Sequence, residues 1–168
     1  MTKSDSPRRP QGYSAKVEAI RAAEQARLAA MPPPVTGRDV AAVLERYPLL
    51  SWAGNGYGPS WQGHNAMLKE FRGRLLADSS VTSVGRMRDW ITANLVPRKA
   101  FINGPSSYRL KHIAERAGAG YSSNGEFLVA AILAGLPVDM ASGDLNPSIG
   151  VTQRSVRDAD PRLRGGAR

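Results

Sequence analysis

The fold is decided by residues 106–135, which read SSYRLKHIAERAGAGYSSNGEFLVAAILAG. The first part has apolar residues at helical spacing, a serine that can cap its start, and an end at Gly118. Ser123 and Glu126 then have the spacing of a capping box before a second, almost wholly apolar stretch. Two helices joined by a short glycine-containing turn form a helix-turn-helix-like pair. This stretch therefore predicts a helical fold.

The second helix of this pair is predicted to lie in the core. It is apolar nearly all round and holds no basic residue from Gly125 to Gly135. A recognition helix needs side chains that reach base edges or phosphates, and this helix lacks them. The first helix is therefore the better candidate for contact with nucleic acid.

The first helix carries a set of basic side chains. Arg109, His112 and Arg116 are spaced i, i+3 and i+7, which places them on one helix face with Lys111 beside it. Two more cations precede the helix in the connector. The candidate nucleic-acid-binding residues are therefore Arg98, Lys99, Arg109, Lys111, His112 and Arg116. The same pattern also fits a solvated helix face or a surface that binds an acidic protein.

The segments around this pair are also predicted to be helical. Apolar residues at helical spacing predict a helix after Thr36, another over 67–75 and a third that Ser83 caps. Together they predict a mostly α domain over 36–151, whose last part, 138–151, is irregular.

An arm and two tails are expected outside this domain. Residues 1–13 hold Ser, Pro, Arg and Gly with nothing to bury, so we expect a disordered basic tail. Residues 14–31 predict an alanine-rich helical arm that prolines end. Residues 152–168 are expected to form a second basic tail, which would add affinity for phosphates without sequence specificity.

Composition favours an anionic partner. The 168 residues include 23 Lys and Arg against 14 Asp and Glu, a net charge of +9, which favours anionic partners, namely nucleic acid, acidic protein surfaces or anionic membrane. The absence of cysteine excludes disulfides and thiolate metal sites. No run of about 18 apolar residues could span a membrane, and the basic N-terminus lacks the apolar core of a signal peptide. We therefore expect a cytoplasmic protein that does not act at a membrane.

Catalytic motifs are missing from the sequence. The two histidines do not have the spacing of metal ligands, and there is no G-x-S-x-G elbow, H-E-x-x-H motif or Walker lysine. Asp139 and Asp144 are two acids in an irregular segment, a pattern too common to predict a metal site. The sequence predicts a non-enzymatic protein with no catalytic residues, no cofactor and no metal.

A glycine-rich loop over 51–63 contains Trp52, Tyr57 and Trp61. Aromatic rings beside basic patches can stack unpaired bases, with about 1–3 kcal/mol for each base. In such a loop the rings more often close the edge of a core, and that is our main interpretation. The three residues remain candidates for stacking.

Residues 89–135 also carry a W…N…PRK connector, an S-S-Y-x-L-K-H-x-x-E helix and a Y-x-S-N-G-x-F-x-x-A-A start to the next helix. In these motifs the stretch resembles a group of short uncharacterised bacterial proteins carried by phages and plasmids. It departs from them at 102–105, INGP, where a more basic connector is expected. The resemblance implies an origin in a mobile element and implies no activity.

The function predicted from these observations is nucleic-acid binding without catalysis, with DNA expected before RNA. The protein would be a regulatory or accessory protein of a phage or plasmid, in the bacterial cytoplasm or associated with the nucleoid or virion. The alternative is a protein-interaction role, such as a virion component or an inhibitor of a host defence complex. In that role the arm over 14–30 and the aromatic loop would dock on the partner.

Overall fold

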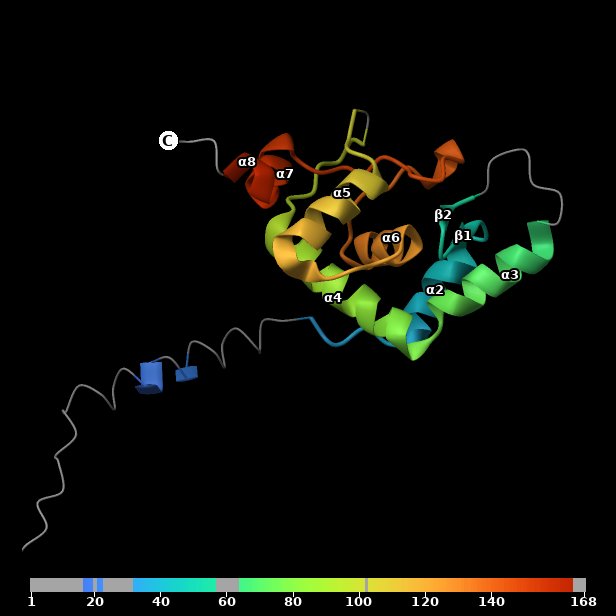
Figure 1. Cartoon of the computed structure of the whole chain (residues 1–168), viewed down its shortest axis with the longest axis horizontal. Coiled ribbons are helices and arrows are strands. Elements are labelled where there is room, and N and C mark those ends of the chain that lie inside the picture. The colour runs from blue at the N-terminus through green and yellow to red at the C-terminus, as the bar shows by residue number, and fades with distance from the viewer. Residues whose placement is uncertain (1–16, 20, 23–31, 57–63, 102, 165–168) are drawn as a thin grey trace, which may run out of the picture. The chain divides into compact units, whose positions relative to one another are not determined.

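The computed structural model describes residues 17–19, 21–22, 32–56, 64–101 and 103–164. The chain divides into two compact units, Met1–Pro33 and Pro34–Arg168. In the first unit, residues 17–19 and 21–22 are helical and fall within the predicted arm, Pro32 and Pro33 are not helical, and the predicted tail over 1–13 lies outside the described residues. The second unit is mostly helical (Figure 1), which confirms the predicted fold class.

Helix α6 (Asn124–Leu133) forms the centre of the second unit. Helices α2 (Gly37–Arg46), α4 (Asp78–Asn94) and α5 (Ser107–Ala114) pack around it (Figure 1). All side chains from Asn124 to Ala131 are buried. A helix surrounded by other helices needs apolar residues on every side, which explains its composition. The prediction that this segment is a core helix is confirmed.

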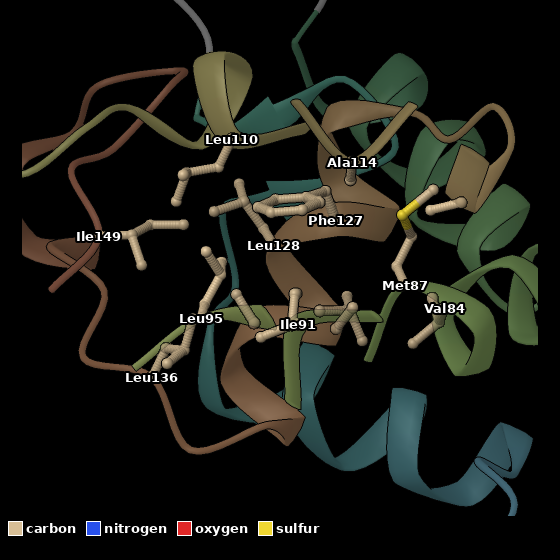
Figure 2. Close-up of a cluster of buried hydrophobic side chains, with 14 of the residues drawn as sticks. Val84, Met87, Ile91, Leu95, Leu110, Ala114, Phe127, Leu128, Leu136 and Ile149 are labelled. Carbon is tan, nitrogen blue, oxygen red and sulfur yellow. The ribbon is translucent and has the colours of Figure 1, made fainter. Parts of the chain in front are cut away.

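The core is built on Phe127 and Leu128 of α6, which are fully buried. They share one cluster with Met87 and Ile91 of α4 and Leu110 of α5 (Figure 2). Burial of one such side chain contributes about 1.5–3 kcal/mol, so contacts of α6 with α4 and α5 supply much of the stability. The helix-turn-helix-like pair is therefore part of the core and not a module attached to it.

Helix α4 begins earlier than the sequence predicts. Its first residue is Asp78, so the predicted cap Ser83 lies inside the helix and is buried. The Ser83 hydroxyl donates to Glu126 Oε2 at 3.2 Å, and the same oxygen accepts the Ser123 N–H at 2.7 Å. The Ser83 prediction is wrong because this serine joins the capping box of α6 and does not cap its own helix.

The segment between α2 and α4 contains a small hairpin and a helix. Thr36 caps α2 as predicted, and strands β1 (Leu50–Ser51) and β2 (Gly54–Asn55) then pair antiparallel. The expected loop over 51–63 therefore begins with a hairpin, and its residues from 57 onward lie outside the described residues. Helix α3 (His64–Leu75) follows, in agreement with the predicted helix there.

The predicted C-terminal tail over 152–168 is wrong for most of its length. Residues in it form α7 (Gln153–Ala159) and α8 (Pro161–Arg164). Val156 and Ala159 are buried, and α7 packs against α4 and α5. Two apolar residues spaced i, i+3 thus anchor an otherwise charged segment. The last four residues lie outside the described residues.

The expected irregular segment over 138–151 is confirmed. It contains a 3₁₀ turn, η2 (Met140–Ser142), and pairs through isolated bridges, including Val138 with Ile149 and Pro97 with Val151. Within the described ranges, no helix is long and apolar enough to cross a membrane.

Candidate functional site

The N-terminal turn of α5 carries one of the predicted basic residues at the surface. Ser106 caps the helix, and its hydroxyl accepts the N–H of Arg109 at 3.3 Å. The Arg109 side chain is exposed, as is that of Lys99 in the connector before the helix. Neither side chain forms an ion pair with the described part of the chain. Both are therefore placed where the sequence predicts them.

Lys111 and His112, in contrast, are held by a carboxylate of the same segment. Lys111 is 5% exposed, and its Nζ donates to Glu115 Oε1 at 2.8 Å. His112 Nδ1 lies 2.8 Å from Glu115 Oε2, and the Ser122 N–H donates to Glu115 Oε1 at 3.2 Å. Glu115 lies in a π-helical turn, η1 (Glu115–Ala119), and so ties α5 to the segment before α6. The predicted placement of Lys111 on an outer basic face is wrong, because this residue falls on the buried side of α5.

The charge of Glu115 depends on these contacts. Burial by itself raises the pKa of Glu115, but hydrogen bonds from Lys111, Ser122 and His112 outweigh it and hold the pKa below its ordinary value of 4.5. Because the folded pKa is the lower one, the carboxylate stabilises the fold fully above the ordinary value. This contribution is lost as the pH falls through the lowered folded pKa.

The variant Glu115→Gln is therefore expected to lose part of the acid sensitivity of the fold. Urea titrations from about pH 7 to about pH 3 should show that its free energy of unfolding falls less steeply than that of the wild type. Glu70→Gln is the matched control, because the pair that Glu70 forms with Arg74 is exposed. Equal acid slopes in Glu115→Gln and the wild type would contradict the role given to this carboxylate.

Arg116 links the helix pair to the C-terminal helices. Its Nη2 lies 3.4 Å from Asp160 Oδ2, and Asp160 is 7% exposed. Asp160 follows α7, and its other oxygen accepts the N–H of Arg162 at 3.1 Å. The predicted candidate Arg116 is thus occupied by a structural contact between two parts of the fold.

The connector before α5 runs beside the segment that leads into α7. The Arg98 N–H donates to Gly150 O and the Thr152 N–H donates to Val96 O, both at 2.9 Å. The Arg98 Nε donates to Ala100 O at 3.1 Å. These bonds bring α7 to the same end of the unit as the connector and α5 (Figure 1).

Helix α7 adds basic residues that the sequence analysis assigned to a tail. Arg154 and Arg157 are exposed, and Arg154 forms an exposed pair with Asp158 at 3.7 Å. Helical spacing of Val156 and Ala159 within the charged segment was the signal that could have identified this helix. We define the α5–α7 basic surface as Arg98, Lys99, Arg109, Arg154 and Arg157.

A pocket of ≈ 500 Å³ lies next to α5. Three aromatic residues line it: Trp52 from the hairpin, Tyr108 from α5 and Tyr121 from the segment before α6. Lys111 Nζ lies 5.4 Å from the ring centroid of Tyr108 and 5.6 Å from that of Tyr121. The ring of Tyr108 also packs edge-on against His112, with centroids 4.3 Å apart. The pocket thus combines aromatic walls with a fixed cation.

Polar atoms in the pocket lining include two without hydrogen-bond partners in the described part of the chain. These are Ser122 Oγ and Asn124 Oδ1, both buried. The Asn124 Nδ2 donates to Leu145 O and Asn146 Oδ1, each at 3.0 Å, which fixes the amide. A buried polar atom without a partner costs about 1–3 kcal/mol.

Of the predicted stacking residues, only Trp52 falls within the described residues; Tyr57 and Trp61 lie outside them. The ring of Trp52 packs edge-on against Phe71 of α3 at 6.3 Å, so it closes the edge of the core while it lines the pocket. Tyr108 and Tyr121 were missed. An aromatic residue next to a basic one, as in Tyr108 and Arg109, was the signal that could have found them.

Neither a metal site nor a similar known protein identifies a function for these residues. Among the described residues, no group of three or more His, Asp or Glu side chains could hold a metal ion. No protein-family model, no curated protein and no solved structure matches the chain.

Proposed function

We propose that the protein binds nucleic acid, DNA before RNA, through the α5–α7 basic surface and without catalysing a reaction. The observation that carries the proposal is the exposure of Arg109 and Lys99, which have no ion pair with the described residues. From 96 to 110 the connector and the first turn of α5 hold three basic residues, Arg98, Lys99 and Arg109, and no acidic residue. Cations without a neighbouring acid can neutralise phosphates and release their counterions.

The form of the helix pair supports DNA as the partner. A helix with an exposed, capped N-terminal turn, followed by a turn and a second helix that packs in the core, resembles the arrangement of major-groove binders. The first helix takes the place of the recognition helix here, because α6 is buried. The resemblance of 89–135 to phage and plasmid proteins supports an origin in such an element, where the bound DNA would be that of the element or its host.

The double variant Lys99→Ala plus Arg109→Ala should weaken DNA binding without unfolding the protein. Loss of two phosphate contacts should reduce the slope of log K against log salt by about 2. Fluorescence anisotropy with a labelled duplex at several salt concentrations measures this slope. Both side chains are exposed, so the free energy of unfolding should change by less than about 0.5 kcal/mol.

The control for this variant is Arg38→Ala plus Lys69→Ala, which removes two exposed cations from α2 and α3. This control lowers the net charge by the same amount as Lys99→Ala plus Arg109→Ala does. Its salt slope should stay closer to that of the wild type. Equal slopes in the two double variants would mean that only the total charge matters, and the site assignment would be wrong. Stable co-purification of a protein after a high-salt wash, with no nucleic acid bound, would favour the protein-interaction role.

A further inference from the structure

The pocket beside α5 has the size and walls of a site for a planar aromatic ligand. Its volume of ≈ 500 Å³ lies within the usual range of about 300–1,000 Å³ for small-ligand sites. Tyr108 is 51% exposed and Tyr121 69% exposed, so both rings keep surface that the fold itself does not cover. Trp52 supplies a third, half-buried ring. Aromatic side chains around a hollow are suited to stacking on another ring system.

The pocket already contains a positive charge, the ammonium group of Lys111, and this charge excludes a cationic ligand. Lys111 Nζ already lies near the rings of Tyr108 and Tyr121, and Glu115 holds it there. A positively charged ligand would meet this amine and would compete with it for the same rings. A neutral aromatic ring system attached to an anionic group meets no such repulsion.

The pocket lining also offers polar groups for the edge of such a ring. Asn124 Oδ1 is an acceptor without a partner, and Ser122 Oγ can donate or accept. The hydrogen bonds of the Asn124 amide to Leu145 and Asn146 fix which atom remains unpaired. A nucleobase carries ring nitrogens, carbonyls and amino groups that can pair with these two side chains once they turn toward the pocket.

We infer that this pocket receives one unpaired nucleobase of the bound nucleic acid, stacked against Tyr108 and Tyr121. The inference rests on the proposed function, because the strand that carries the base would be held by the α5–α7 basic surface. Tyr108 directly precedes Arg109 in α5. A base beside Tyr108 would therefore have its neighbouring phosphates close to an exposed arginine.

The test compares two labelled single strands of about 12 nucleotides with the same number of phosphates, one with bases and one abasic throughout. Fluorescence anisotropy should show that the wild type binds the strand with bases about tenfold more tightly. Tyr121→Ala should abolish this difference while the salt slope stays unchanged. Tyr121→Phe keeps the ring and should keep the difference. The side chain is exposed, so folding is not at risk.

The outcomes separate the pocket from the basic surface. Equal binding of both strands by the wild type, with a steep salt slope, would overturn the pocket and leave the proposed function intact. A preference for bases that persists in Tyr121→Ala would also overturn the pocket. If neither the strands nor the labelled duplex bind, but adenosine monophosphate binds the wild type and not Tyr121→Ala, the pocket stands and the proposed function fails. Absence of binding to strands, duplex and nucleotide would overturn both.

Discussion

Replacement of Gly125 by alanine is expected to destabilise the protein by about 3 kcal/mol, although alanine is the better helix former. A Cβ at this position would lie 1.9 Å from Ser51 O and 2.8 Å from Trp52 Cα. Both neighbours are backbone atoms, and the Gly125 N–H donates to Trp52 O at 3.0 Å, which holds the two segments together. The strands of the hairpin would have to move away from α6.

Gly73→Ala is the matched control for this substitution. Gly73 also lies inside a helix, α3, but a Cβ there would meet nothing within 4 Å. Alanine at this position should therefore stabilise the protein by about 0.5–1 kcal/mol. Urea denaturation followed by far-UV circular dichroism measures both changes. If Gly125→Ala is as stable as the wild type, this result would contradict the close contact between α6 and the hairpin.

The second large effect is expected for Arg72→Ala, with a loss of about 2–4 kcal/mol in the free energy of unfolding. The guanidinium of Arg72 donates to four carbonyl oxygens at the end of α2 and in the chain leading to β1. Its acceptors are Leu44 O at 2.7 Å, Tyr47 O at 3.0 Å, Pro48 O at 2.7 Å and Leu50 O at 2.9 Å. Helix ends leave carbonyls without partners, and one planar cation satisfies them here.

Two variants test this assignment of Arg72. Burial lowers the pKa of Arg72, so part of the stabilising contact is offset by the cost of removing the cation from water. Arg72→Lys keeps the charge but cannot reproduce the fork of N–H donors, and an intermediate loss of stability is expected. Arg74→Ala, which removes an exposed partner of Glu70, should cost less than about 1 kcal/mol. Equal losses for Arg72→Ala and Arg74→Ala would contradict the carbonyl clamp.

Half of the candidate basic residues could be placed from the sequence. Helical spacing correctly puts Arg109 at the surface, and the connector does the same for Lys99. The sequence could not show that Arg116 pairs with Asp160, because Asp160 comes from a segment that was expected to be a tail. The pocket was also beyond prediction, since Trp52, Tyr108 and Tyr121 belong to three segments that only the fold brings together.

Local sequence patterns identified helices α2, α5 and α6 and showed which of them lies in the core. Capping residues, glycine ends and apolar spacing act within a few residues of the chain, so α2, α5 and α6 could be found from local pattern alone.

The contacts between polar groups of different segments became visible only in the folded protein. Ser83 reaches the carboxylate of Glu126, Lys111 turns inward to Glu115, and Gly125 allows the hairpin to touch α6. The first and third contacts join segments far apart in the chain. The second depends on which side of α5 the core covers. These contacts depend on how the segments pack against one another, and the residue pattern of a single helix does not reveal that packing.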